Sequence, residues 1–116
     1  MGRAPRYAEV PIAWARDERQ AVQAVLETSR WLVTGWKVMS ELPNPANFDA
    51  VSAHVEEKHV RQLFSVGPDP EPHVAKARTF VEAGFDHIVL QNAGPDPDGF
   101  LDFFAGELAG RLRGLA

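Results

Sequence analysis

The feature that most constrains the fold is an apolar segment, residues 85–90, between two helix-forming patterns. Gly84 precedes it and is suited to end a helix in the left-handed conformation. The segment itself is rich in β-branched and apolar residues, which is typical of a buried strand. Asp96 and Pro97 suit the cap and the first position of a following helix. Residues 80–104 therefore predict helix, buried strand and helix, one unit of a parallel α/β sheet.

The end of this strand carries two polar residues, Gln91 and Asn92. In parallel sheets and barrels the functional residues lie where a strand ends and its loop begins. Contact with a substrate is one interpretation of these side chains, and simple hydrogen bonding within the loop is the other. The sequence leaves both open.

The chain before this unit divides into a strand-helix unit and an irregular stretch. Residues 7–15 alternate as a strand does, although Pro11 favours an edge position because it cannot donate to a ladder. A helix over 18–33 follows. Residues 34–66 predict a helical insert with short helices at 45–53 and 56–63, and residues 67–116 form the final α-β-α unit. We interpret the whole chain, 1–116, as a single partial domain.

Composition excludes several classes of function. The 116 residues carry a net charge of −4, contain no cysteine and include no apolar run of membrane-spanning length. We therefore expect a cytoplasmic protein that binds neither nucleic acid nor membrane. The four histidines lack metal-ligand spacing, so we interpret them as surface or helix-end residues and expect no metal.

The difficulty with a self-contained fold is the number of strands. Two convincing strands leave unpaired edges and helix faces with little to cover. The chain is therefore predicted to be part of a larger α/β sheet, or to complete itself by association.

Several motifs together resemble a known family. They are GPDPE at 67–71, AGFDH at 83–87, GPD at 94–96 before an aromatic-rich helix ending in RLR, and ELPNPANF at 41–48. This combination is similar to the C-terminal end of luciferase-like flavin- and deazaflavin-dependent oxidoreductases. The similarity is greatest to the branch of deazaflavin-dependent glucose-6-phosphate dehydrogenases. The resemblance implies a C-terminal fragment of a (β/α)₈ TIM barrel: the last two βα units plus a helical insert.

The same resemblance implies an oxidoreductase that uses coenzyme F420, a deazaflavin, or FMN. Its chemistry would be hydride transfer or, in one branch, monooxygenation. Such a barrel needs about 250 residues, and the family places most of its coenzyme pocket and acid-base residues ahead of the last strands. We therefore expect no catalytic residue in this chain, no activity, and no coenzyme bound by it alone. The expected partner is a second copy of the chain or a chain that carries the rest of the barrel.

The sugar-phosphate branch holds the substrate phosphate with a lysine in the insert and an arginine before a short extended piece. Lys37 and Arg61 lie in these regions, but Gln62 aligns at the arginine position, which weakens the expectation of a sugar phosphate. Trp14 lies at the end of the first strand, and its side chain is interpreted either as packed in the core or as a substrate contact. The candidate substrate-binding residues are Trp14, Lys37, Arg61, Gln62, Gln91 and Asn92.

The alternative is a stand-alone, non-catalytic α/β module. It would self-associate or bind a protein partner through its exposed strand edges and the face formed by Phe100, Phe103 and Phe104.

Overall fold

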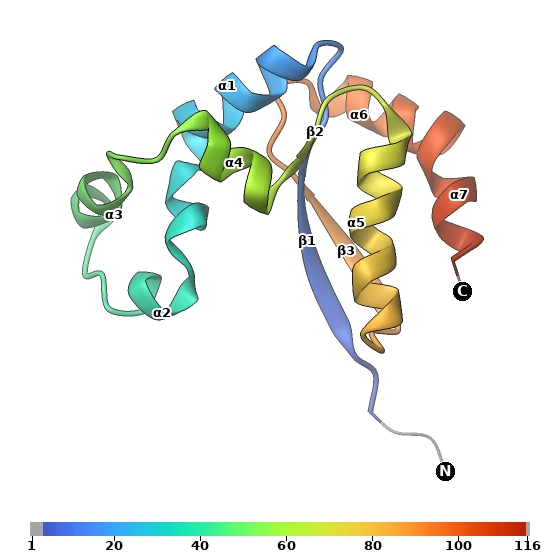
Figure 1. Ribbon diagram of the computed structural model, residues 1–116, viewed down its shortest axis with the longest axis horizontal. Helices are drawn as coiled ribbons and strands as arrows, with labels where there is room; N and C mark the ends of the chain where they lie inside the picture. Colours follow the sequence, from blue (N-terminus) through green and yellow to red (C-terminus); the bar gives the residue numbers. More distant parts are fainter. Residues whose placement is uncertain (1–3, 116) are drawn as a thin grey trace.

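The computed structural model describes residues 4–115 and shows three strands with helices around them (Figure 1). The elements are β1 (Tyr7–Ala13), α1 (Glu18–Thr28), a 3₁₀ helix (Arg30–Thr34), α2 (Trp36–Met39), α3 (Pro45–Ser52), α4 (Glu57–Leu63), β2 (Ser65–Val66), α5 (Pro70–Glu82), β3 (His87–Asn92), α6 (Pro97–Phe103), a π-helical turn (Phe104–Leu108) and α7 (Ala109–Arg113). No helix within residues 4–115 is long and apolar enough to cross a membrane.

Four helix starts follow local capping chemistry, for which the sequence provides an Asp or Asn just before the first helical turn. Asp17, Asn44, Asp69 and Asp96 each accept a hydrogen bond from a backbone N–H of the first helical turn. Gly84 has a φ of 100° just after α5 ends, the left-handed geometry that favours glycine.

The sheet is entirely parallel, with the order β2-β1-β3. β1 pairs with β3 from Tyr7 opposite His87 to Ile12 opposite Asn92. β2 pairs only with Ile12 and Ala13, at the carboxyl end of β1. The long ladder therefore joins segments 80 residues apart, and β2 is a short addition at its top.

Pro11 lies in the central strand, so the expectation that its strand is an edge strand is wrong. The carbonyl of Ile12 accepts from Ala93 N–H on the β3 side, and that of Ala13 accepts from Gly67 N–H on the β2 side. Because residues two apart point the same way, the Pro11 nitrogen faces the β2 side. β2 pairs only beyond Pro11, so the missing donor falls on an uncovered stretch of the edge.

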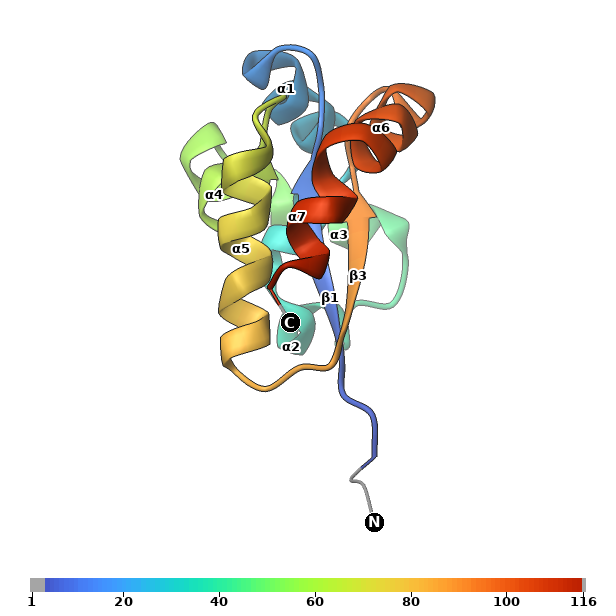
Figure 2. The same ribbon diagram turned by 90° about the vertical axis from the view of Figure 1, so that its right-hand side faces the viewer.

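One face of the sheet is covered by helices. Ala8, Val10 and Ile12 are buried and pack with Phe80 and Phe85, which lie in and just after α5. Figure 2 shows α5 and α7 in front of the sheet on this side. A second apolar cluster, around Trp14, Val74, Phe103 and Leu108, continues the same layer.

The other face is largely uncovered, and we call it the open face. Its side chains alternate with the buried ones, and they come from three register pairs: Tyr7 with His87, Glu9 with Val89, and Pro11 with Gln91. Only its carboxyl end is covered, where Ala13 packs with α1 and α4. Parallel sheets are normally covered on both faces.

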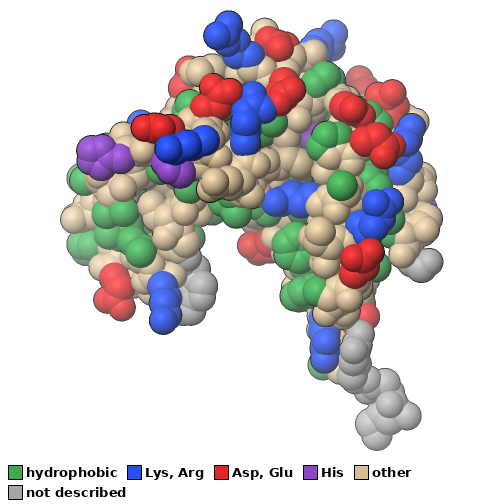
Figure 3. All heavy atoms as spheres, viewed as in Figure 1, with side chains coloured by type: hydrophobic (Ala, Val, Ile, Leu, Met, Phe, Trp, Pro, Cys, Tyr) green, Lys and Arg blue, Asp and Glu red, His purple; other side chains and the backbone are tan. Residues whose placement is uncertain are grey.

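The shape reflects this incomplete covering. The lobe of α2 and α3 stands away from the sheet, and Figure 3 shows the molecule hollowed between the two. The radius of gyration is 15.1 Å, against about 13 Å for a compact domain of this length. The views in Figures 1 and 2 place the open face toward this hollow.

The apolar residues of the C-terminal helical segment follow a helical spacing that predicts one packed side, formed by Phe100, Leu101, Phe103, Phe104, Leu108 and Leu112. The structure differs from this prediction at one position. Phe100, Phe103, Phe104, Leu108 and Leu112 pack together as expected. Leu101, predicted on the same side, is 61% exposed.

Candidate functional site at the carboxyl ends of the strands

The ends of β1 and β3 are tied together by the side chain of Asn92. Its Oδ1 accepts hydrogen bonds from Trp14 N–H at 2.9 Å and from Gly94 N–H at 3.0 Å. A Cβ added to Gly94 would lie 2.0 Å from the Trp14 carbonyl oxygen, so only glycine fits this approach. Asn92 is thus engaged in loop hydrogen bonding, one of the two interpretations that the sequence left open.

Gln91 and Asn92 point to opposite faces of the sheet, although they are neighbours in the sequence. Gln91 is exposed on the open face, beside Pro11, whereas Asn92 lies on the helix-covered side. The structure therefore separates these two predicted substrate contacts.

Trp14 packs inside the molecule. Its ring is buried and stacks on Phe103, with centroids 5.5 Å apart, and a Cβ on Gly99 would lie 2.7 Å from it. Its Nε1 is buried without a hydrogen-bond partner among residues 4–115. Most of this side chain therefore packs in the core. Its indole N–H donates no hydrogen bond within the described residues.

Arg61 is held by acidic side chains. Its guanidinium donates to Glu57 at 2.9 and 3.0 Å and pairs with Glu18 across the fold. Hydrogen bonds to Glu18 and then Glu57 raise the pKa of Arg61 above its ordinary value. Two carboxylates thus already bind the guanidinium group with which a substrate anion would have to pair.

The cavity beside Arg61 has mixed charge. Its volume is about 390 Å³, and Glu18, Asp69 and Lys76 also line it. Burial lowers the pKa of Lys76 below its ordinary value. Gln62 is exposed on α4, next to Arg61.

Lys37 lies in α2 and is exposed, at the end of the lobe far from the carboxyl end of β1 (Figure 1). The structure therefore brings Trp14 and Asn92 together but distributes Lys37, Arg61 and Gln91 over three different surfaces.

His73 is a residue whose setting the sequence did not reveal. It lies at the start of α5, so it is a helix-end histidine as the sequence indicates, but it is completely buried and therefore not a surface residue. Its Nε2 lies 2.9 Å from the Gly67 carbonyl and its Nδ1 2.6 Å from Ser65 Oγ. Because a carbonyl only accepts, Nε2 carries the proton and the Ser65 hydroxyl donates to Nδ1. Burial lowers the pKa of His73, and the neutral ring fastens β2 to α5.

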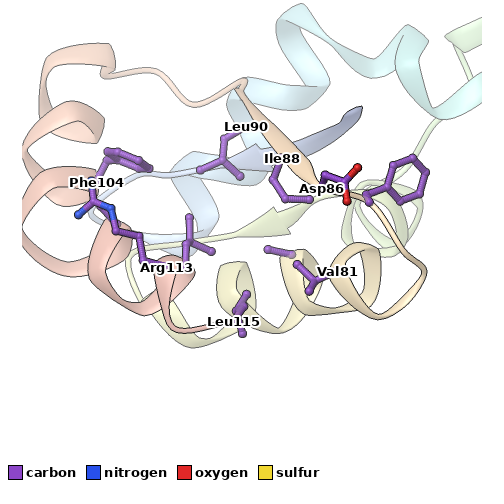
Figure 4. Close-up of a pocket in the computed structure, with 11 residues that line it drawn as sticks. Val81, Asp86, Ile88, Leu90, Phe104, Arg113 and Leu115 are labelled. Carbon is purple, nitrogen blue, oxygen red and sulfur yellow. The ribbon is translucent and has the colours of Figure 1, made fainter. Parts of the chain in front are cut away.

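Two further cavities lie beside the C-terminal helical segment. One, of about 350 Å³, lies beside Trp14 and is edged by Arg16, Asp102 and Glu107. The other, of about 510 Å³, lies on the helix side between α5, β3 and α7, where Figure 4 shows Ile88 and Leu90 with Phe104 and Arg113 around it. The described residues contain no group of three or more His, Cys, Asp or Glu side chains that would hold a metal ion.

Comparison with known proteins connects the chain to one group of enzymes. It is 30% identical over 118 aligned residues to F420-dependent glucose-6-phosphate dehydrogenase 1 of Rhodococcus jostii, covering 96% of the chain and 33% of the relative. It is 29% identical over 117 residues to the corresponding enzyme of Rhodococcus erythropolis, covering 95% of the chain and 32% of the relative. The resemblance to F420-dependent, luciferase-like oxidoreductases is thereby confirmed.

The fold comparison agrees. An F420-dependent secondary alcohol dehydrogenase, solved in complex with an F420-acetone adduct, matches with a TM-score of 0.74 and 21% identity. The match covers 94% of this chain and 32% of that one, and it confirms the prediction of a fragment of a TIM barrel. The chain spans about a third of the length of the relatives it matches. No family model matches it.

Proposed function

We propose that this chain supplies two neighbouring strands, β1 and β3, to the barrel of an F420-dependent oxidoreductase that moves a hydride between a substrate and the deazaflavin. Activity then requires the further barrel strands that cover the open face. The observation that carries the proposal is this face: a parallel pair of strands with exposed Tyr7, Glu9 and Val89 on the side where a barrel has its interior. The F420-dependent relatives support the choice of chemistry.

The described residues alone do not fit the coenzyme. A deazaflavin ring is planar and needs apolar surfaces and a few directed hydrogen bonds. The two cavities near the carboxyl ends are edged by charged side chains, among them Glu18, Arg61 and Asp69 in one and Asp102 and Glu107 in the other. The ring is therefore held chiefly by other strands, and no reaction step is assigned to residues of this chain.

The surroundings of Arg61 do not suit glucose 6-phosphate as a substrate. A phosphate at Arg61 would compete with Glu18 and Glu57 for the guanidinium and would meet Asp69 nearby. Gln62 offers an amide instead of a charged fork. We infer a substrate without a phosphate group.

The test is complementation. The chain is co-expressed with the part of the Rhodococcus jostii enzyme that it does not match, and the co-purified complex is titrated with F420. We expect F420 binding by the complex and none by the isolated chain. Tight binding of F420 by the isolated chain would contradict the proposal, because the pocket would then lie within residues 1–116.

The second candidate is a non-catalytic module that binds a protein partner, and the open face also favours it. Of the two surfaces predicted for this module, the aromatic face is largely packed away, because Phe103 is buried and Phe100 and Phe104 pack into the same cluster. The predicted strand edge is present in the described residues, since β3 lies at the end of the sheet order. A stable complex that binds neither F420 nor FMN would favour this candidate.

A further inference from the structure

We propose that the strands covering the open face carry a basic side chain opposite Glu9, and that this charge favours them over a second copy of the chain. The inference rests on the proposed function, since it concerns the partner that completes the barrel. It goes further in naming the chemistry that this partner presents.

The open face consists of three rows of side chains. At the amino end of the strands, Tyr7 stacks on His87 with ring centroids 4.3 Å apart. In the middle row Glu9 lies opposite Val89, which is 46% exposed. The row at the carboxyl end pairs Pro11 with Gln91. Glu9 is thus the one acidic group among these six residues, and it stands at the centre.

Covering this face buries the Glu9 carboxylate. Removing an ionised carboxylate from water without a counter-charge is strongly unfavourable, whereas a hydrogen-bonded cation offsets much of this penalty. Within residues 4–115 no cation is paired with Glu9, which takes part in none of the salt bridges found there. Of the other side chains on this face, Pro11 and Val89 are apolar, Gln91 is an uncharged amide, and His87 is stacked on Tyr7. The counter-charge must therefore come from whatever covers the face.

A second copy of the chain is the wrong occupant for the same reason. Two identical faces pack about a two-fold axis, and two orientations of that axis cover all three rows. With the axis along the middle row, Glu9 lies against Glu9 of the other copy, and like charges placed together at an interface disfavour the contact. With the axis along the strands, Glu9 lies against Val89 of the other copy and is buried without a counter-charge. In neither orientation does a second copy place a basic side chain opposite Glu9.

The experiment uses the chain co-expressed with the unmatched part of the Rhodococcus jostii enzyme. Dissociation constants are compared for the wild type, Glu9→Gln, Glu9→Lys and the control Glu82→Lys, which makes the same charge change at the exposed end of α5. We expect Glu9→Lys to weaken the complex by about 30-fold or more, Glu9→Gln to weaken it less, and Glu82→Lys to leave it unchanged. Far-UV circular dichroism of each isolated variant confirms that the fold is kept.

The outcomes separate this inference from the proposed function. Wild-type complex formation with equal affinity for Glu9→Lys overturns the inference and leaves the proposed function standing. Failure of the wild type to form any complex contradicts both.

A second measurement needs no partner. Light scattering after size-exclusion chromatography gives the oligomeric state of the isolated chain over a wide concentration range. We expect Val89→Lys to leave the oligomeric state unchanged and Glu9→Leu to promote self-association. A wild-type dimer that Val89→Lys dissociates would overturn the inference, because a second copy would then cover the face.

Discussion

Replacing Asn92 by alanine should destabilise the fold by about 2 kcal/mol. Its Oδ1 accepts from Trp14 N–H and Gly94 N–H, in a part-buried position where the two strand ends meet. A net hydrogen bond contributes about 0.5–1.5 kcal/mol, and removing the shared acceptor leaves two backbone donors unpaired. At roughly 4 °C per kcal/mol for a domain of this size, the melting temperature should fall by about 8 °C.

The assay is urea unfolding followed by circular dichroism, with thermal melting as a second measurement. Asn92→Asp is the matched control, because a carboxylate keeps the acceptor and should remain within about 1 kcal/mol of the wild type. An Asn92→Ala variant as stable as the wild type would refute the assignment of Asn92 to the strand clamp. In the complemented complex, a loss of turnover in a fully stable Asn92→Asp would instead show substrate contact.

Three other changes test the fold. His73 has a lowered pKa, so its contribution to stability is complete above the unfolded pKa of about 6.5 and is lost as the pH falls below it. The urea concentration at the unfolding midpoint should therefore decrease as the pH is lowered from about 7.5 to 5.5. In a His73→Gln variant this midpoint should depend less on pH. Gly94→Ala should lower the free energy of unfolding by about 3 kcal/mol, measured by urea unfolding, because the added Cβ would overlap the Trp14 carbonyl. A variant as stable as the wild type would contradict this geometry. Leu108→Ala should cost about 3 kcal/mol in the same assay, whereas Leu101→Ala should stay within about 0.5 kcal/mol, because Leu108 is buried and Leu101 is exposed.

What the sequence could predict was local. The helix starts at Asp17, Asn44, Asp69 and Asp96 depend on a side chain and an N–H two or three positions on, so short patterns contain the necessary information. The resemblance supplied the architecture, because motifs from separate elements occur together in one family.

The candidate site was harder to predict because its side chains are oriented by contacts distant in sequence. His73 can be buried because its ring hydrogen-bonds to the carbonyl of Gly67 and the hydroxyl of Ser65. A pattern of apolar residues in the sequence does not reveal either contact. The exposure of Leu101 depends on how α6 and the π-helical turn pack on the sheet. The opposite orientations of Gln91 and Asn92 follow from the two-residue period of a strand, and the sequence contained that signal.

The register of β1 with β3 has a consequence for how the chain folds during synthesis. β1 is complete at Ala13, but the last residue of its main partner, Asn92, follows nearly 80 residues later. At ribosomal rates of 5–20 residues per second, the strand waits about 4–16 s for that partner. For most of this time Ala8, Val10 and Ile12 have neither the ladder with β3 nor α5 to shield them, because α5 is complete only at Glu82. Of the three strands described, β1 is thus made first and is among the last to be paired along its length, and a chaperone would bind this segment during that interval.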